Sequence, residues 1–296
     1  MDRLPVSALL QRLTPPGLWR AWSFQPEVLL PLALASLIYL AGTVRAWRHA
    51  GSGRGVRLHR VACFIVAILA LVAALLSPLD ALSGSLFSAH MVQHLLLMML
   101  AAPLLVMSDF PLALLWVLPA AQRRALGQGW NAAPLLTRSW RAVTSPAGAW
   151  LLFALAMWLW HAPAFFQAAL RHESIHTLEH LSFLLTAMLF WWVLLRQSGP
   201  GHVRYGAAVP YLFTTSLHSS ILGALMTFTV QPWYPYYVRS SASWGLTALA
   251  DQQLAGLIMW IPGGMVFAAL TIGYFAAWLH SMDQRHPFSA RHDADR

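Results

Sequence analysis

The chain has 296 residues, of which 58% are hydrophobic and only 10% are charged, whereas about a quarter of a soluble domain is charged. Runs of about 20 apolar residues recur along its length, which indicates a membrane protein. All 19 basic residues are Arg and the net charge is +9, but they lie in short loops between apolar segments, so we expect no nucleic-acid partner. The single Cys63 excludes an internal disulfide, a CxxC redox pair or a thiolate metal cluster.

Residues 1–27 contain no continuous apolar stretch, so we expect no cleaved signal peptide and interpret them as a short arm outside the membrane. Seven apolar segments follow, and we predict that residues 28–280 form an all-α bundle of seven transmembrane helices. The predicted spans are Val28–Ala46, Val61–Leu79, Leu86–Met107, Ala147–Ala162, His176–Leu195, Ala207–Val230 and Gln253–His280.

Residues 111–146, between the third and fourth spans, begin with an apolar stretch that is too short to cross a membrane. Proline bounds that stretch, and Trp130 and Trp140 follow it. We predict that this part of the membrane domain is re-entrant or lies at the membrane interface. We see no internal repeat and no separate soluble domain.

The distribution of Arg predicts the orientation of the bundle. Fourteen Arg residues lie on one side of the predicted membrane and five on the other. Because positive charge accumulates on the cytoplasmic side, the amino-terminal arm is predicted outside and residues 281–296 form a cytoplasmic tail. An odd number of spans agrees with termini on opposite sides.

The third predicted span carries two histidines four residues apart, His90 and His94. Residues at that spacing stack on one helix face, so their imidazoles can bind one metal ion or line a polar path. Met98 continues this face, and the fifth span repeats the pattern with His176 and His180. Because ionisable groups inside a membrane cost several kcal/mol, each pair needs a partner or a purpose.

Other spans also carry polar or soft side chains. His161 ends the fourth span, His218 lies in the sixth, and Asp251 opens the seventh, with Met259 two turns further on. With the predicted orientation most of these groups lie near the outer face, and His218 lies nearer the middle. We predict one metal site near the outer surface. Its predicted ligands are His90, His94, His161, His176, His180, His218 and Asp251, with Met98 and Met259 as possible soft ligands.

Structural explanations stay open for several of these residues. His161 and His218 can serve as interhelical hydrogen-bonding groups, and the methionines can simply fill space between helices. Asp251 can cap the amino end of its own span. Glu179 stands one position off the histidine stripe, where it can hydrogen-bond a metal ligand without touching the metal.

Three ordered groups of residues carry a resemblance to a known family. They are His90-Met-Val-Gln-His94 with Ala-Ala-Pro-Leu-Leu at 101–105; Trp160-His161-Ala-Pro with His176-Thr-Leu-Glu-His180 and Phe190-Trp-Trp; and Asp251-Gln-Gln-Leu-Ala-Gly-Leu-Ile-Met-Trp260. Their order and spacing, and the number of spans, resemble the CtaG-type (caa3) cytochrome c oxidase assembly factors of bacteria across about residues 28–280.

The resemblance implies a multi-pass protein of the bacterial inner membrane that helps to mature a haem–copper oxidase, with copper delivery as its activity. Its partners would be subunits of cytochrome c oxidase and the lipid bilayer, and a homo-oligomer stays open. An unrelated single-span copper chaperone of the same name uses cysteines, whereas this chain has only Cys63, so its route to copper would be histidine-based. We expect no enzymatic activity, because no hydrolytic or nucleophilic constellation is visible.

Two other functions fit the same residues. Histidines on facing helices can ligate haem as axial pairs, which predicts a membrane cytochrome. The histidines and Asp251 can also form a relay in a metal or proton-coupled transporter. The absence of an evident repeat and of paired helices broken by Gly or Pro weighs against the transporter.

Overall fold

The computed structural model describes residue 17 and residues 20–51, 53–195 and 205–283. Within these ranges every regular element is a helix, which confirms the predicted all-α fold. Most of the predicted arm and tail (1–16, 18–19 and 284–296) lies outside the described residues, as does the connection at 196–204.

Long helices form the body of the molecule. They are α3 (Pro26–Ala50), α4 (Leu58–Leu75), the continuous α6–η1–α7 (Phe87–Leu95, Leu96–Ala101 and Ala102–Met107), α11 (Pro146–His161), α13 (Glu173–Leu195), α14 (Tyr205–Phe228) and α15 (Ala248–Asp283). Short helices connect them. These are α5 (Pro78–Ser83), α8 (Phe110–Val117), α9 (Ala120–Asn131), α10 (Pro134–Val143), α12 (Pro163–Arg171), η2 (Pro235–Val238) and η3 (Ser241–Trp244).

Five of the described helices are long and apolar enough to cross a membrane, namely α3, α4, α6–η1–α7, α13 and α15. A sixth span results if α10 and α11, which meet at 65°, count as one broken span. Helix α14 has 24 residues, but its hydroxyl residues and His218 lower its hydropathy, and it does not qualify. The chain is therefore a multi-pass membrane protein with five to six candidate spans, and the count of seven stays a prediction.

Proline sets the start of several helices, because its missing N–H is not needed in the first turn. Pro78 opens α5 and Pro146 opens α11, each after a serine whose hydroxyl accepts a backbone N–H of the new helix. Pro163 opens α12, and Ala162 before it is extended, as a residue preceding proline prefers. His161 is consequently the last residue of α11, at the point where the chain turns into α12.

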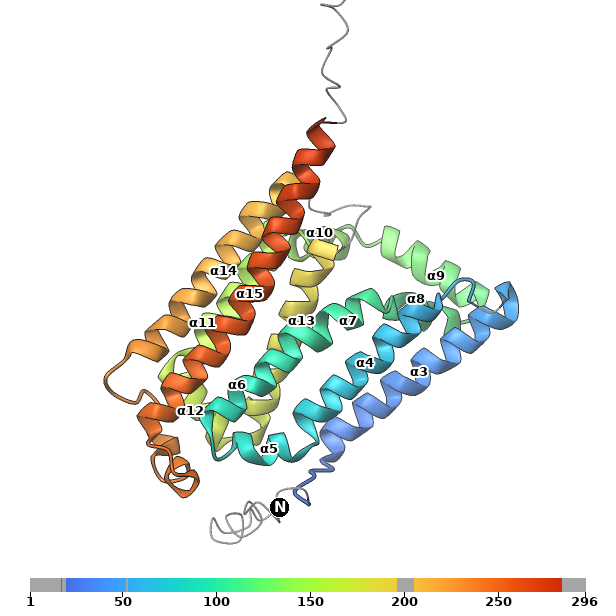
Figure 1. Cartoon of the computed structure of the whole chain (residues 1–296). Coiled ribbons are helices and arrows are strands. Elements are labelled where there is room, and N and C mark those ends of the chain that lie inside the picture. Colours follow the sequence, from blue (N-terminus) through green and yellow to red (C-terminus); the bar gives the residue numbers. More distant parts are fainter. Residues whose placement is uncertain (1–16, 18–19, 52, 196–204, 284–296) are drawn as a thin grey trace, which may run out of the picture.

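Figure 1 shows α14 and α15 side by side along one flank and α3 beside α4 along the other, with α6–η1–α7 and α13 between them. The main core lies where α6, α11, α13, α14 and α15 meet, and a smaller core joins α3, α4 and α8. Helices α5 and α12 lie at one end of the bundle, together with the 229–247 connection, and α9 and α10 lie at the other (Figure 1).

Residues 111–146 are helical throughout most of their length. Helix α8 packs along α3, where the carbonyl of Ala113 lies against Gly42 and leaves no room for a side chain. The turn before α8 uses Asp109 in a left-handed conformation (φ 52°), and its carboxylate forms an ion pair with Arg60 of α4. Helices α9 and α10 have no buried residues, so this segment lies on the surface of the protein.

Candidate metal centre

Histidines of α6 and α13 meet inside the bundle. The Nε2 atoms of His90 and His94 are 2.9 Å apart, and both side chains are buried. The His176 ring centroid lies 5.2 Å from that of His90, and the His180 centroid lies 5.3 Å from that of His94. The two stripes that the sequence predicts therefore face each other across one interhelical space.

Glu179 brings the only carboxylate of this cluster among the described residues. Its oxygens lie 3.8 Å from Nε2 of His90 and 3.7 Å from Nε2 of His94, and the side chain is fully buried. Neither oxygen accepts a hydrogen bond, and no Arg pairs with it in the described chain. A buried carboxylate in that position either carries a proton or balances a bound cation.

We name His90, His94, His176, Glu179 and His180 the histidine cluster. Two overlapping groups of its ligand atoms lie within 4.8 Å of one another, one made of three histidines and one that includes Glu179. Ligands about 2.0–2.2 Å from a tetrahedral metal are roughly 3.3–3.6 Å apart, so these separations need only small side-chain movements to hold an ion. The donor set of imidazoles and a carboxylate fits a transition metal.

Asp251 fixes the start of α6, although it belongs to α15. Its carboxylate accepts the backbone N–H groups of Phe87 (2.6 Å) and Ser88 (3.1 Å) and the Ser88 hydroxyl (2.5 Å). The first turn of a helix has free N–H groups and a positive dipole end, so a buried carboxylate is well matched to this position. The contact holds the turn that precedes His90.

Aromatic residues cover the cluster at the α5–α12 end of the bundle. Phe166 of α12 lies 5.0 Å from the His90 ring, and Tyr234 and Tyr237 from the 229–247 connection pack with it. Burial raises the pKa of the Tyr237 phenol well above its ordinary value, so the hydroxyl keeps its proton and donates it to the Ser83 carbonyl at 2.9 Å.

This arrangement favours one tautomer of His90. Because the Tyr237 proton is used by Ser83, its oxygen can only accept from Nδ1 of His90, at a long 3.5 Å. With the proton on Nδ1, the lone pair of His90 is on Nε2, the atom that faces His94 and Glu179. A deprotonated Nε2 is the form that binds a metal.

A turn of π-helix, η1, directly follows His94. The N–H of Ala102 bonds to the carbonyl of Leu97, five residues back. The next bond in this register would join Pro103 to Met98, but proline has no N–H, and the indole of Trp191 donates to the Met98 carbonyl instead, at 2.8 Å. Trp191 of α13 thus ties the widened turn of the third span to the helix that carries His180.

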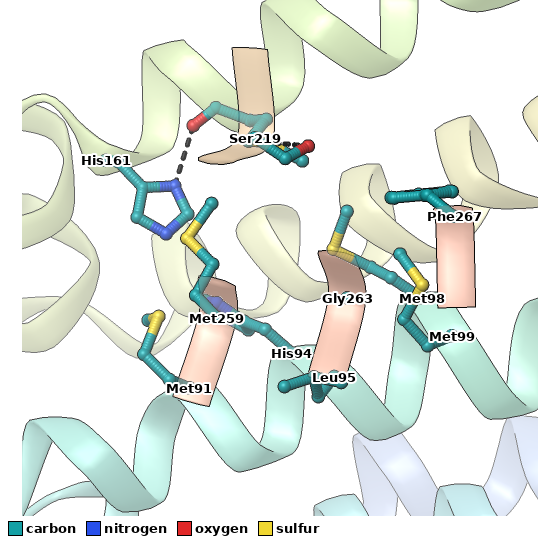
Figure 2. Close-up of a pocket in the computed structure, with 11 residues that line it drawn as sticks. Met91, His94, Leu95, Met98, Met99, His161, Ser219, Met259, Gly263 and Phe267 are labelled. Carbon is teal, nitrogen blue, oxygen red and sulfur yellow. Dashed lines mark hydrogen bonds between the residues drawn. The ribbon is translucent and has the colours of Figure 1, made fainter. Parts of the chain in front are cut away.

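The structure places the remaining predicted ligands outside the histidine cluster. The His161 ring centroid is 6.1 Å from that of His94, and its Nδ1 bonds to the Met157 carbonyl at 2.7 Å. Met98 and Met259 line a separate cavity with His161 and His94 (Figure 2).

Two of the predicted ligands, Asp251 and His218, are not among the clustered donors. The sequence predicts that Asp251 binds metal or caps its own helix, but its oxygens accept hydrogen bonds from the start of α6. Thr247 caps α15 instead, by accepting the N–H of Ala250. His218 packs against Trp150, with ring centroids 5.5 Å apart, and is not among the clustered donors, because it lies on a turn of α14 that faces α11.

Two residues of the site were not among the predicted ligands. Glu179 follows His176 by three residues, and residues at that spacing share a helix face, so the sequence did carry a signal for its place in the cluster. Tyr237 lies in a loop without periodicity, about 150 residues from the histidines of α6, and no pattern in the sequence indicates its contact with Ser83.

The profile of the family described as cytochrome c oxidase caa3 assembly factor (Caa3_CtaG) matches residues 37–281 of this chain. The chain belongs to this family. The match confirms the predicted resemblance, and it contains every residue of the histidine cluster. The assembly-factor family thus supplies the functional context for the geometry of the site.

Curated relatives are mycobacterial and are themselves described only as uncharacterised. One from Mycobacterium leprae is 25% identical over 291 residues, which is 94% of this chain and 42% of the relative. Proteins of Mycobacterium bovis and Mycobacterium tuberculosis are each 28% identical over 250 residues, 79% of this chain and 38% of theirs. The chain therefore spans about two fifths of these relatives. No solved structure matches it.

Proposed function

We propose that this protein binds copper through the histidine cluster and supplies it to a cytochrome c oxidase during assembly. The observation that carries the proposal is a buried carboxylate, Glu179, which faces Nε2 of both His90 and His94 without an Arg partner in the described chain. A bound cation would neutralise Glu179 and could take Nε2 of His90 and of His94 as ligands. Because the chain belongs to a family of cytochrome c oxidase assembly factors, we propose the oxidase as the recipient of the copper.

Copper is the metal that best fits this donor set and this family. Imidazole nitrogen is a good ligand for copper, and copper binds such sites most tightly among the first-row divalent metals. The oxidases that the family serves are haem–copper enzymes. A binding and delivery role requires no nucleophile or acid–base pair, so we propose a metal-handling protein and not an enzyme.

We further propose seven spans in the bacterial inner membrane, with α11 and α14 added to the five helices that qualify alone. The Arg-rich loops after α3 and α7 lie at the end of the bundle opposite α5 and α12 (Figure 1). With those loops in the cytoplasm, the amino terminus is outside, the carboxyl terminus is inside, and the histidine cluster faces the outer side. Copper for the oxidase would then be handled outside the cytoplasm, with an oxidase subunit as partner.

Elemental analysis of the purified protein tests copper binding. We expect copper in the wild type after copper-replete growth, much less in His90→Ala/His94→Ala, and a wild-type amount in His218→Ala, a matched intramembrane histidine outside the cluster. In a deletion strain, oxidase activity should return with the wild type and His218→Ala but not with the double variant.

Three results would count against the proposal. Metal-free wild type would reject the ligand assignment, and equal copper in the double variant would place the metal elsewhere. A Soret band in the purified protein would favour the haem alternative instead. His90→Gln/His94→Gln, which keeps polar side chains of similar length, provides a second variant if the alanine protein does not fold.

A further inference from the structure

A cavity rich in methionine side chains adjoins the histidine cluster. It is a cavity of about 40 Å³ between α6–η1, α11 and α15. Five methionines line it, namely Met91, Met98, Met99, Met157 and Met259, and we name this space the methionine chamber. His94 and His161 also line it, so His94 belongs to both sites (Figure 2).

The concentration of sulfur in this chamber is unusual for the chain. The protein has 11 methionines in 296 residues, and five of them surround one small cavity. Methionine often fills irregular gaps, and that role alone would explain a few of them. A histidine among the methionines distinguishes a binding site from a packing gap, because a polar side chain does not stabilise a gap that is otherwise apolar.

His161 presents an unused ligand atom in this chamber. Its Nδ1 lies 2.7 Å from the Met157 carbonyl, which can only accept, so Nδ1 carries the proton and Nε2 holds a lone pair. The side chain is 4% exposed, and Nε2 has no hydrogen-bond partner. A histidine fixed by a backbone carbonyl through one nitrogen, with the other free, is a common arrangement of a metal ligand.

Met91, His161 and Met259 line the same cavity, and in Figure 2 the Met259 thioether points toward the His161 ring. Met157, one helical turn before His161, accepts the Ser219 hydroxyl at its sulfur (3.4 Å), which restrains the side chain. Imidazole nitrogen and thioether sulfur thus converge from three helices. All of these donors are neutral, so the chamber suits a cation of low charge.

We propose that the methionine chamber is a site for Cu(I), with His161 Nε2 and the thioethers of Met91, Met157 and Met259 as its donors. Soft thioether ligands select Cu(I) over harder divalent ions. The inference rests on the proposed function, since it specifies the oxidation state of the copper and adds ligands. His94 connects the two sites, because its Nε2 faces Glu179 and its ring lines the chamber.

The test uses the purified full-length protein and two probes, Ag(I) as a redox-inert mimic of Cu(I), and Zn(II). We expect Met91→Leu/Met259→Leu to weaken Ag(I) binding by at least about tenfold, because removal of a ligand costs no less than removal of its supporting partner. Zn(II) binding should not change. Met265→Leu, on the same helix as Met259 but 69% exposed, is the matched control.

Each outcome bears on the chamber separately from the histidine cluster. Unchanged Ag(I) affinity in the double variant would show that the methionines only pack. Absence of Ag(I) binding by the wild type would reject the chamber even if copper content still depends on His90 and His94. X-ray absorption of the Cu(I)-loaded wild type provides a readout without any substitution: we expect sulfur neighbours, and nitrogen or oxygen neighbours alone would overturn the proposal.

Discussion

Asp251 holds the start of α6, the helix that carries His90 and His94 of the histidine cluster. It lies 164 residues from Phe87 in the sequence, yet its carboxylate takes up the first N–H groups of α6. Replacement by Asn keeps the shape but removes the charge and directs an amide N–H toward those donors. Since hydrogen bonds to a charged group contribute about 1.5–3 kcal/mol each, we expect Asp251→Asn to lower the free energy of unfolding by roughly 2 kcal/mol.

Thermal unfolding in detergent measures this effect, and copper content of the same preparation reports the loss of order at His90. Glu27→Gln, the same chemical change at an exposed position in the first turn of α3, is the control and should shift stability by less than about 0.5 kcal/mol. Wild-type stability in Asp251→Asn would mean that the cap contributes nothing.

The pairs His90/His94 and His176/His180 could be predicted because helical periodicity alone places each pair on one face. The role of Asp251 could not, because a cap donated by another helix depends on packing between segments far apart in the chain. The same holds for Tyr237. Sequence periodicity therefore predicts the paired histidines on each helix, and only the fold shows which groups orient them.

Helices α14 and α15 pack closely because glycines face each other at their contact. A Cβ on Gly256 would collide with the Thr227 hydroxyl and would lie 2.7 Å from the Gly223 carbonyl. Small residues of this kind allow helix backbones to approach within a membrane. The contact matters for the site, because α15 carries both Asp251 and Met259.

We expect Gly256→Ala to destabilise the protein by about 1–3 kcal/mol, since two of the three nearest atoms, the Gly223 carbonyl oxygen and the Thr227 amide nitrogen, belong to the backbone and cannot move aside. Gly273→Ala on the same helix has open space around the new Cβ, and should be neutral or slightly stabilising because Ala favours the helix. Thermal unfolding of the two variants compares them directly. Equal melting temperatures would contradict the close approach.

Helix boundaries show what sequence periodicity leaves open. The predicted second span continues to Leu79, but α4 ends at Leu75 and α5 begins at Pro78, because Ser77 and Pro78 start a new helix. The fifth and seventh helices begin three and five residues earlier than predicted, at Glu173 and Ala248. The first turns of these two helices contain polar residues, so hydropathy does not reveal them, although capping allows them to be helical.

In the whole molecule, the clustered histidines and the Arg residues of α9 and α10 lie at opposite ends of the helical bundle. Helices α6 and α13 begin at the α5–α12 end, and their histidines lie near these starts, whereas α9 and α10, which together contain four Arg residues, lie at the opposite end (Figure 1). The sequence predicts that histidines from separate spans lie at one depth, because successive spans run in opposite directions across the membrane. Helices α6 and α13 both begin at the same end, and α11 ends there, so the geometry agrees with it.

Cysteine accessibility tests the orientation and the span count together. In a Cys63→Ala background, Gly127→Cys places a thiol on α9, where a Cβ meets nothing within 4 Å, and Ser243→Cys places one on exposed η3. Three proposed spans, α11, α13 and α14, separate the two positions. A membrane-impermeant maleimide on intact cells should therefore label Ser243→Cys and not Gly127→Cys, and permeabilised cells should label both.

The opposite pattern would place the histidine cluster at the cytoplasmic face and remove the argument that copper is received outside. Labelling of both positions in intact cells would require an even number of spans between them, which would mean that α11 or α14 does not cross the membrane. Because η3 follows Tyr237 in the connection that covers His90, the thiol at 243 reports the side of the membrane to which the histidine cluster is nearer.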